Sequence, residues 1–190
     1  MESPLENWFI FPPGAGNGLA ARTGVYIIMR RNRPHPSNRQ SPATGSLVKV
    51  ILAEKPSVAR KIAAIVGART RHDGYMEGSG YQVTWAYGHL VELKEPEDYD
   101  PALKRWSLDA LPFIPERFEL KVIQDPSSRQ QFNVIKRLFR SAEEIVCATD
   151  AGREGELIFR YILAMTGCEG KPFRRLWLNS LTPSTIREAL

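Results

Sequence analysis

The chain has 190 residues and a mass of 21.5 kDa, which is the size of one domain with a hydrophobic core, with or without an extension. Hydrophobic residues make up 43% and charged residues 25%, so the composition is globular rather than disordered or collagen-like. Much of the net charge of +5 comes from residues 1–45, which carry five arginines and two glutamates. Bulk charge therefore identifies no nucleic-acid partner for the rest of the protein.

The sequence predicts neither a membrane partner nor secretion. The longest apolar runs, residues 8–11 and 25–29, are far shorter than the roughly 20 residues that cross a bilayer. Neither run has the basic region and small-residue cleavage site of a secretory signal. Cys147 and Cys168 form no metal-binding spacing, so we expect reduced thiols in a cytoplasmic protein, with Cys147 an inert core thiol.

The amino-acid composition differs between residues 1–45 and residues 46–190. Residues 1–45 contain six of the 14 prolines and five of the 14 glycines, which favours a poorly ordered N-terminal extension. The folded domain is expected at residues 46–190. It opens with an apolar strand over residues 47–53 and a helix that starts at Pro56 and stops at Gly67.

The same strand-and-helix unit recurs further along. Residues 144–149 predict a strand, followed by a helix that ends at Gly167, and residues 173–179 predict a strand before a helix near Thr182. A helix from Asp125 precedes the second unit. Residues 75–87 predict an antiparallel hairpin around residues 78–80, and residues 94–126 a long surface excursion.

This alternation predicts an α/β fold: a mainly parallel, Rossmann-like sheet with helices on both faces and an inserted antiparallel hairpin. In such sheets ligands bind beyond the carboxyl ends of the strands. Residues 53–57 and 149–156 occupy two such ends and are therefore the candidate site.

The first strand end presents Glu54, Lys55 and Ser57 at the start of a helix, where backbone amides and the helix dipole favour a phosphate. The alternative is that Glu54 and Lys55 are solvated turn residues and that Ser57 is a helix cap.

At the second strand end, Asp150 and Glu154 are four residues apart and repel each other if they share a helical face. A Mg²⁺ ion would offset the repulsion, because it prefers a few carboxylates with water and phosphate oxygens. The alternative makes Asp150 a helix cap, with Glu154 and Glu156 favoured by the helix dipole and Arg153 as their partner. A further acid on a neighbouring strand, Glu54, favours the metal site.

Five separated motifs resemble the N-terminal Toprim domain of type IA DNA topoisomerases, in the topoisomerase III branch. The resemblance covers residues 48–190. Its motifs are AEKPSVARKIA, GHLVEL, LPFIPERFEL, TDAGREGELIFR and LWLNSLTP.

The resemblance implies roles for individual residues. Glu54 resembles the family's acid/base glutamate near the scissile phosphate, and Lys55 its phosphate-contacting lysine. Asp150 and Glu154 resemble the first and last acids of its Asp-x-Asp-x-Glu metal motif, and Arg153 the arginine of its Arg-Glu-Gly run. We therefore expect Glu54, Lys55 and Arg153 in catalysis and one Mg²⁺ at Asp150 and Glu154, with Glu54 close by.

The sequence departs from the family pattern at two places. Gly152 stands where the family has its middle acid, which weakens a two-metal site and could allow close backbone approach. None of the six tyrosines matches the context of the family's nucleophile, which lies in a later domain. We therefore expect a Toprim domain truncated at its C-terminal end and inactive alone in DNA relaxation.

The resemblance implies a monomer that acts on single-stranded DNA and contributes metal and phosphate binding to strand cleavage and resealing. A stand-alone Toprim nuclease or primase-like module and a non-catalytic DNA-binding remnant are the alternatives.

Three other features have simpler explanations than ligand binding. We expect His89 to be a structural, hydrogen-bonded residue and Trp85 and Trp177 to be buried rather than stacked on bases. The cluster of Lys136, Arg137 and Arg140 is expected to be the solvated face of a helix.

Overall fold

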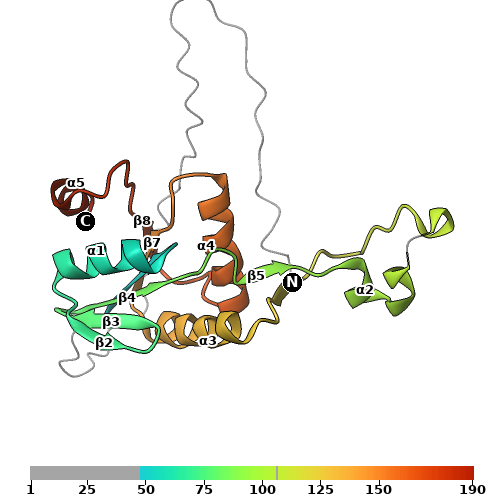
Figure 1. Cartoon of the computed structure of the whole chain (residues 1–190), viewed down its shortest axis with the longest axis horizontal. Helices are drawn as coiled ribbons and strands as arrows, with labels where there is room; N and C mark the ends of the chain where they lie inside the picture. Colours follow the sequence, from blue (N-terminus) through green and yellow to red (C-terminus); the bar gives the residue numbers. More distant parts are fainter. Residues whose placement is uncertain (1–47, 106) are drawn as a thin grey trace, which may run out of the picture. The chain divides into compact units, whose positions relative to one another are not determined.

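The computed structural model describes residues 48–105 and 107–190, so the extension expected at residues 1–45 lies outside the described residues. A six-stranded sheet forms its centre, in the order β2-β3-β4-β1-β7-β8 (Figure 1). The last four strands in this order are parallel, whereas β3 is antiparallel to both of its neighbours. The strands are β1 (Lys49–Ala53), β2 (Thr70–His72), β3 (Tyr75–Gly78), β4 (Tyr81–Trp85), β7 (Glu144–Ala148) and β8 (Phe173–Arg175).

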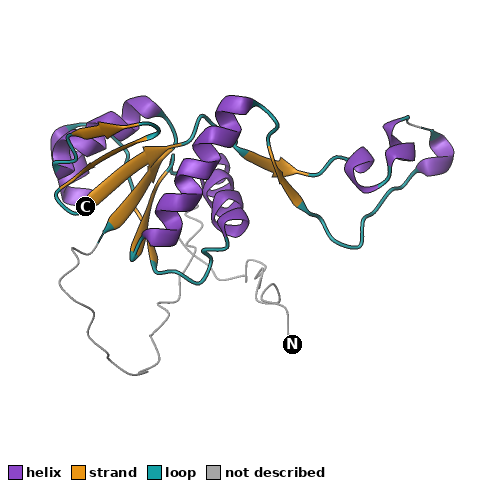
Figure 2. Ribbon diagram, turned by 90° about the horizontal axis from the view of Figure 1, so that it is seen from below, coloured by secondary structure: helices purple, strands orange, loops and turns teal. Residues whose placement is uncertain are grey.

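Helices cover both faces of the sheet, as predicted (Figure 2). Alternate residues of β1 face opposite layers because side chains alternate along a strand. Val50 and Leu52 pack in one core with α3 (Pro126–Ser141) and α4 (Arg153–Thr166). Ile51 and Ala53 pack in the other core with α1 (Pro56–Val66) and α5 (Pro183–Ala189). The central strand is therefore buried on both sides.

The helix boundaries follow the local signals in the sequence. Helix α1 begins at Pro56, and Gly67 ends it in the left-handed conformation with φ of 79°. Gly167 ends α4 in the same way with φ of 69°. A residue with a Cβ is strained at such angles, which is why glycine marks these stops.

The last parallel strand is shorter than predicted. Strand β8 ends at Arg175 rather than at residue 179. The N–H of Leu176 donates to the carbonyl of Cys147 at 2.8 Å, and the chain then leaves the sheet toward α5. Trp177 is consequently not buried by the strand, and the expectation that it is buried is wrong: it is 65% exposed. Cys147 is buried as predicted, and burial raises the pKa of its thiol.

The predicted hairpin consists of β3 and β4, and β4 is also an integral strand of the parallel sheet. Strand β2, which the sequence analysis missed, pairs with β3. Buried Gln131 of α3 holds the hairpin in place: its Nε2 donates to the carbonyls of Gly74 at 3.1 Å and Trp85 at 2.7 Å. Buried Thr84 donates to the same Gly74 carbonyl at 2.8 Å.

The described residues among 94–126 form a surface excursion, as predicted, and none of them is buried. A two-stranded ribbon of β5 (Val91–Leu93) and β6 (Leu120–Val122) forms its base. Its short helices α2 (Pro96–Tyr99), η1 (Pro101–Lys104) and η2 (Leu108–Ala110) contain no buried residue. Across residues 48–105 and 107–190, no helix is both long and apolar enough to span a membrane.

We predict that Gln131→Leu lowers the free energy of unfolding by about 1–3 kcal/mol, because the Trp85 carbonyl loses the Gln131 donor and the Gly74 carbonyl keeps only the bond from Thr84. Urea unfolding measures the change. The matched control is Gln130→Leu, whose amide contacts only exposed Asp73 among the described residues and should matter little. Equal stability of the two variants would contradict this role of Gln131.

Candidate functional site

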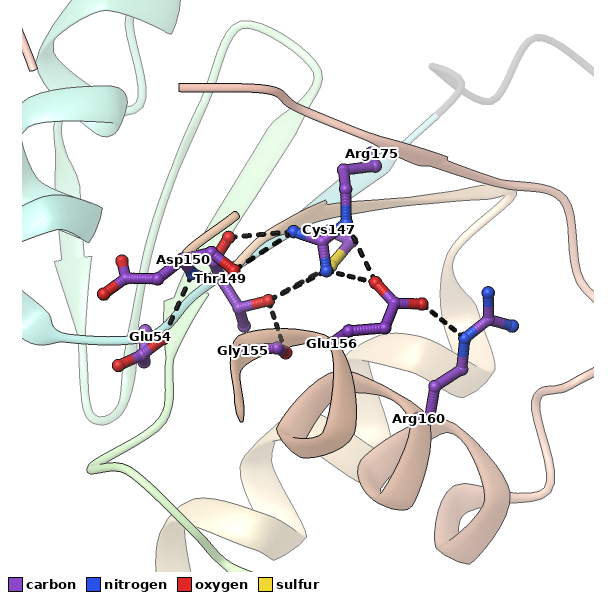
Figure 3. A network of polar contacts seen from close by, with 8 residues as sticks. All are labelled: Glu54, Cys147, Thr149, Asp150, Gly155, Glu156, Arg160 and Arg175. Carbon is purple, nitrogen blue, oxygen red and sulfur yellow. Dashed lines mark hydrogen bonds and ion pairs between the residues drawn. The ribbon is translucent and has the colours of Figure 1, made fainter. Parts of the chain in front are cut away.

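The two predicted strand ends lie side by side at one edge of the sheet. Strands β1 and β7 pair in parallel, with Ala53 opposite Ala148, so the residues that follow them leave the sheet together. Glu54 is only 7% exposed, and its Oε2 accepts a hydrogen bond from the Asp150 backbone N–H at 3.1 Å (Figure 3). A carboxylate this buried requires such a donor, because an unpaired buried charge is costly. The structure therefore brings Glu54 and Asp150 together.

Lys55 extends the first half of the site. Its Nζ lies 3.8 Å from Oε1 of Glu54, the carboxylate oxygen that does not bond Asp150. Lys55 is also the N-cap residue of α1, whereas Ser57 lies inside the first turn and is not the cap. The positive end of the α1 dipole and the Lys55 ammonium thus lie beside the Glu54 carboxylate.

The second half of the site is arranged differently from the sequence-based expectation. Helix α4 begins at Arg153 with Gly152 as its N-cap, so Asp150 lies before the helix and is not its cap. The four-residue spacing therefore does not place Asp150 and Glu154 on one helical face. Glu154 is 77% exposed, and its Oε1 lies 3.8 Å from Nε2 of His89, which gives that histidine a polar partner.

The three predicted metal ligands are not gathered into one cluster. In Figure 3 the carboxylates of Glu54 and Asp150 lie on the same side of the polar network, away from Arg175. Glu154 instead faces His89. Among residues 48–105 and 107–190, no group of three or more His, Cys, Asp or Glu side chains is placed to hold a metal ion. The structure thus brings two of the three acids together, and Arg153 lies exposed at the start of α4.

A buried arginine, which the sequence analysis missed, fixes the turn that carries Asp150. The Arg175 side chain is 3% exposed and comes from the end of β8 (Figure 3). Its Nη1 donates to the Thr149 carbonyl at 3.0 Å, and its Nε donates to Glu156 at 2.9 Å. Glu156 also accepts from Arg160 at 2.7 Å. Arg175 and Arg160, rather than Arg153, are therefore the partners of Glu156.

The charges of this network set the protonation of Glu156. Burial favours the neutral acid, but hydrogen bonds from Arg160 and Arg175 outweigh it and lower the pKa of Glu156. Glu156 is therefore ionised at neutral pH and compensates the buried Arg175 guanidinium. The sequence signal was weak, because Arg174 and Arg175 form an ordinary basic pair until β8 is placed beside β7.

Gly155 allows α4 to pack directly against the Asp150 turn. A Cβ at this position would lie 2.1 Å from the Asp150 carbonyl oxygen. The Gly155 carbonyl accepts a hydrogen bond from Thr149 Oγ1 at 2.7 Å, which ties the first turn of α4 to the end of β7. Gly152, by contrast, has no other part of the described chain within 4 Å of a Cβ built there.

We predict that Gly155→Ala lowers the free energy of unfolding by about 1–3 kcal/mol and shifts the Asp150 amide resonance, because the new methyl group clashes with the Asp150 carbonyl. Urea unfolding and amide NMR measure the two effects. Gly152→Ala is the matched control and should leave the Asp150–Glu54 contact intact. Unchanged Gly155→Ala spectra would contradict the close packing.

We also predict that Glu156→Gln lowers the unfolding free energy at pH 7 by about 1–3 kcal/mol. Because the pKa of Glu156 is lowered by folding, its contribution is complete above the ordinary glutamate value of about 4.3 and is lost as the pH falls through the folded value. Urea unfolding from pH 7 to 3 should show the two proteins converging at acidic pH. A pH-independent difference would count against ionised Glu156.

Comparison with known proteins places these residues in a family. The Toprim domain model matches residues 49–181, which include Glu54, Lys55, Asp150, Arg153 and Glu154. DNA topoisomerase 3 of Bacillus anthracis is 48% identical over 141 residues, covering 73% of this chain and 19% of that protein.

Two further relatives match with similar identity and coverage. DNA topoisomerase 3 of Shouchella clausii is 46% identical over 142 residues, covering 74% of this chain and 19% of that protein. DNA topoisomerase 3 of Staphylococcus epidermidis is 47% identical over 141 residues, covering 73% of this chain and 19% of that protein. The chain thus spans about a fifth of the length of these relatives. Together with the mainly parallel sheet and its paired strand ends, the match over residues 49–181 shows that the chain belongs to the Toprim domain family.

Proposed function

We propose that this chain is the metal- and phosphate-binding Toprim part of a topoisomerase III-like enzyme that cleaves and reseals single DNA strands. The observation that carries the proposal is the buried Glu54 carboxylate, joined to the Asp150 backbone at the carboxyl end of two parallel strands. The similarity of the chain to proteins named DNA topoisomerase 3 supports the same function. We further propose that the protein is a cytoplasmic monomer and that its DNA substrate is single-stranded.

The donor set fits Mg²⁺ as an open site rather than a closed cage. Glu54, Asp150 and Glu154 supply carboxylate oxygens, which are the ligands this cation prefers. Only the first two are held together, and Glu154 is exposed beside His89. Mg²⁺ is typically bound by one or two carboxylates and completes its shell with water and substrate phosphates. Glu54 and Asp150 would therefore hold the ion, exposed Glu154 at the start of α4 would add a third carboxylate, and the bound ion would neutralise phosphate charge.

The remaining residues supply positioning and proton transfer. Glu54 has one oxygen fixed by the Asp150 N–H, while Oε1 is free of that bond and can hold or release a proton beside the DNA phosphate. Lys55, 3.8 Å from that oxygen, stabilises charge on phosphate oxygens. Exposed Arg153 at the start of α4 adds a second cation. Phosphoryl transfer depends largely on such positioning and charge stabilisation.

Strand cleavage by the whole enzyme requires a nucleophile that the described site does not supply. We propose that the 190-residue chain binds metal and DNA but does not relax supercoiled plasmid. A plasmid assay tests this directly. Metal-dependent nicking that is lost in Asp150→Ala and Glu154→Ala would instead favour a self-sufficient Toprim nuclease.

Substitutions at Asp150 and at Gly152, where the family has an acid, test the metal site. We predict weak Mg²⁺ binding, in the range of 10⁻⁴–10⁻³ M, that Asp150→Asn abolishes. Gly152→Asp should tighten binding about tenfold or more, because it adds a carboxylate at a position with open space and extended backbone. Isothermal calorimetry measures both changes.

The control is Glu169→Gln, which removes an exposed acid beyond the end of α4 and should not change Mg²⁺ affinity. Equal Mg²⁺ binding by the wild-type chain, Asp150→Asn and Gly152→Asp would show that the ion does not use this site.

A further inference from the structure

Trp177 is an exposed aromatic residue beside the candidate site. It follows β8, which pairs in parallel with β7, and Cys147 lies opposite Arg175 in that pairing. The segments after these two strands, which carry Asp150 and Trp177, therefore leave the same edge of the sheet. Leu176 is buried in the core with α1 and α5, whereas Trp177 is 65% exposed. The Trp177 indole is therefore accessible to a ligand at this edge of the sheet.

The indole is supported by the network that holds the site. The Arg175 guanidinium lies over the Trp177 ring, 5.5 Å from its centroid. That guanidinium is itself fixed by the Thr149 carbonyl and by Glu156. Such cation–π contact orients the ring and leaves the remainder of its surface to solvent. Trp177 is thus a positioned aromatic surface connected to the turn that carries Asp150.

We propose that Trp177 stacks on an unpaired base of the DNA strand whose phosphate binds at Glu54 and Asp150. The inference rests on the proposed function, because it requires a nucleic acid at that site. Every base offers an aromatic face, so stacking is largely independent of sequence. A base in a duplex already stacks on its neighbours. This residue therefore gives the site a preference for single-stranded DNA.

Scattered exposed apolar residues are common on protein surfaces, so exposure alone would not support this proposal. Trp177 combines exposure with a contact to a fixed cation, and this distinguishes it from Phe118, which is similarly exposed at 66% in the surface excursion. Among the described contacts, Phe118 has no aromatic or cationic partner, whereas Trp177 has the buried Arg175. Phe118 is therefore a matched control.

Fluorescence anisotropy with a labelled oligothymidylate, and with an abasic strand of the same length, tests the proposal on the full chain with Mg²⁺. We expect Trp177→Ala to weaken oligothymidylate binding about tenfold and to leave abasic-strand binding unchanged. Trp177→Phe should restore most of the affinity, and Phe118→Ala should match the wild type. A general structural defect would weaken both strands equally.

The proposal is overturned if Trp177→Ala binds oligothymidylate as tightly as the wild type, or if it loses affinity for both strands alike. Wild-type binding that is equal for the two strands would also overturn it while leaving phosphate binding at Glu54 and Asp150 in place. If the wild type binds neither strand, base stacking is wrong, and the Mg²⁺ titrations of Asp150→Asn and Gly152→Asp decide separately whether the metal site exists.

Discussion

The site depends on one hydrogen bond, from the Asp150 backbone N–H to the buried Glu54 carboxylate. These residues are far apart in the sequence and meet only because β1 and β7 pair in parallel and in register. Burial makes a carboxylate expensive unless donors and cations compensate it. One Glu54 oxygen has the Asp150 N–H and the other has Lys55 nearby. The same pairing that completes the sheet therefore also determines which chemical groups face a ligand.

A second layer of contacts determines the position of Asp150 itself. Arg175 reaches from β8 to the Thr149 carbonyl and to Glu156, and Gly155 lets α4 approach the Asp150 carbonyl. The turn is thus held from the neighbouring strand and from its own helix. Precise placement of a site depends on such supporting contacts. Because Arg175 also lies over Trp177, one guanidinium contacts both the exposed indole and the turn that carries Asp150.

Features encoded locally were predictable from the sequence. Pro56 and the helix-ending glycines, Gly67 and Gly167, marked helix boundaries correctly, because their signals depend on backbone conformation alone. The meeting of Glu54 with Asp150 was predictable from the parallel-strand rule. The role of Arg175 was not predictable from the sequence. It depends on the pairing of β8 with β7, which brings Arg175 to its partner Glu156. The start of α4 at Arg153 likewise moved Asp150 off the helix and removed the basis for pairing it with Glu154.

Two glycines at the start of α4 are present for different reasons. Gly155 is required by space, since any Cβ would contact the Asp150 carbonyl, whereas Gly152 has open surroundings and an ordinary extended backbone. The absence of an acid at residue 152 is therefore not imposed by packing. With only Glu54 and Asp150 held together, the protein supplies too little charge to hold a divalent cation firmly by itself. On the proposed function, phosphate oxygens of DNA complete the shell, so metal and DNA bind more tightly together than either does alone.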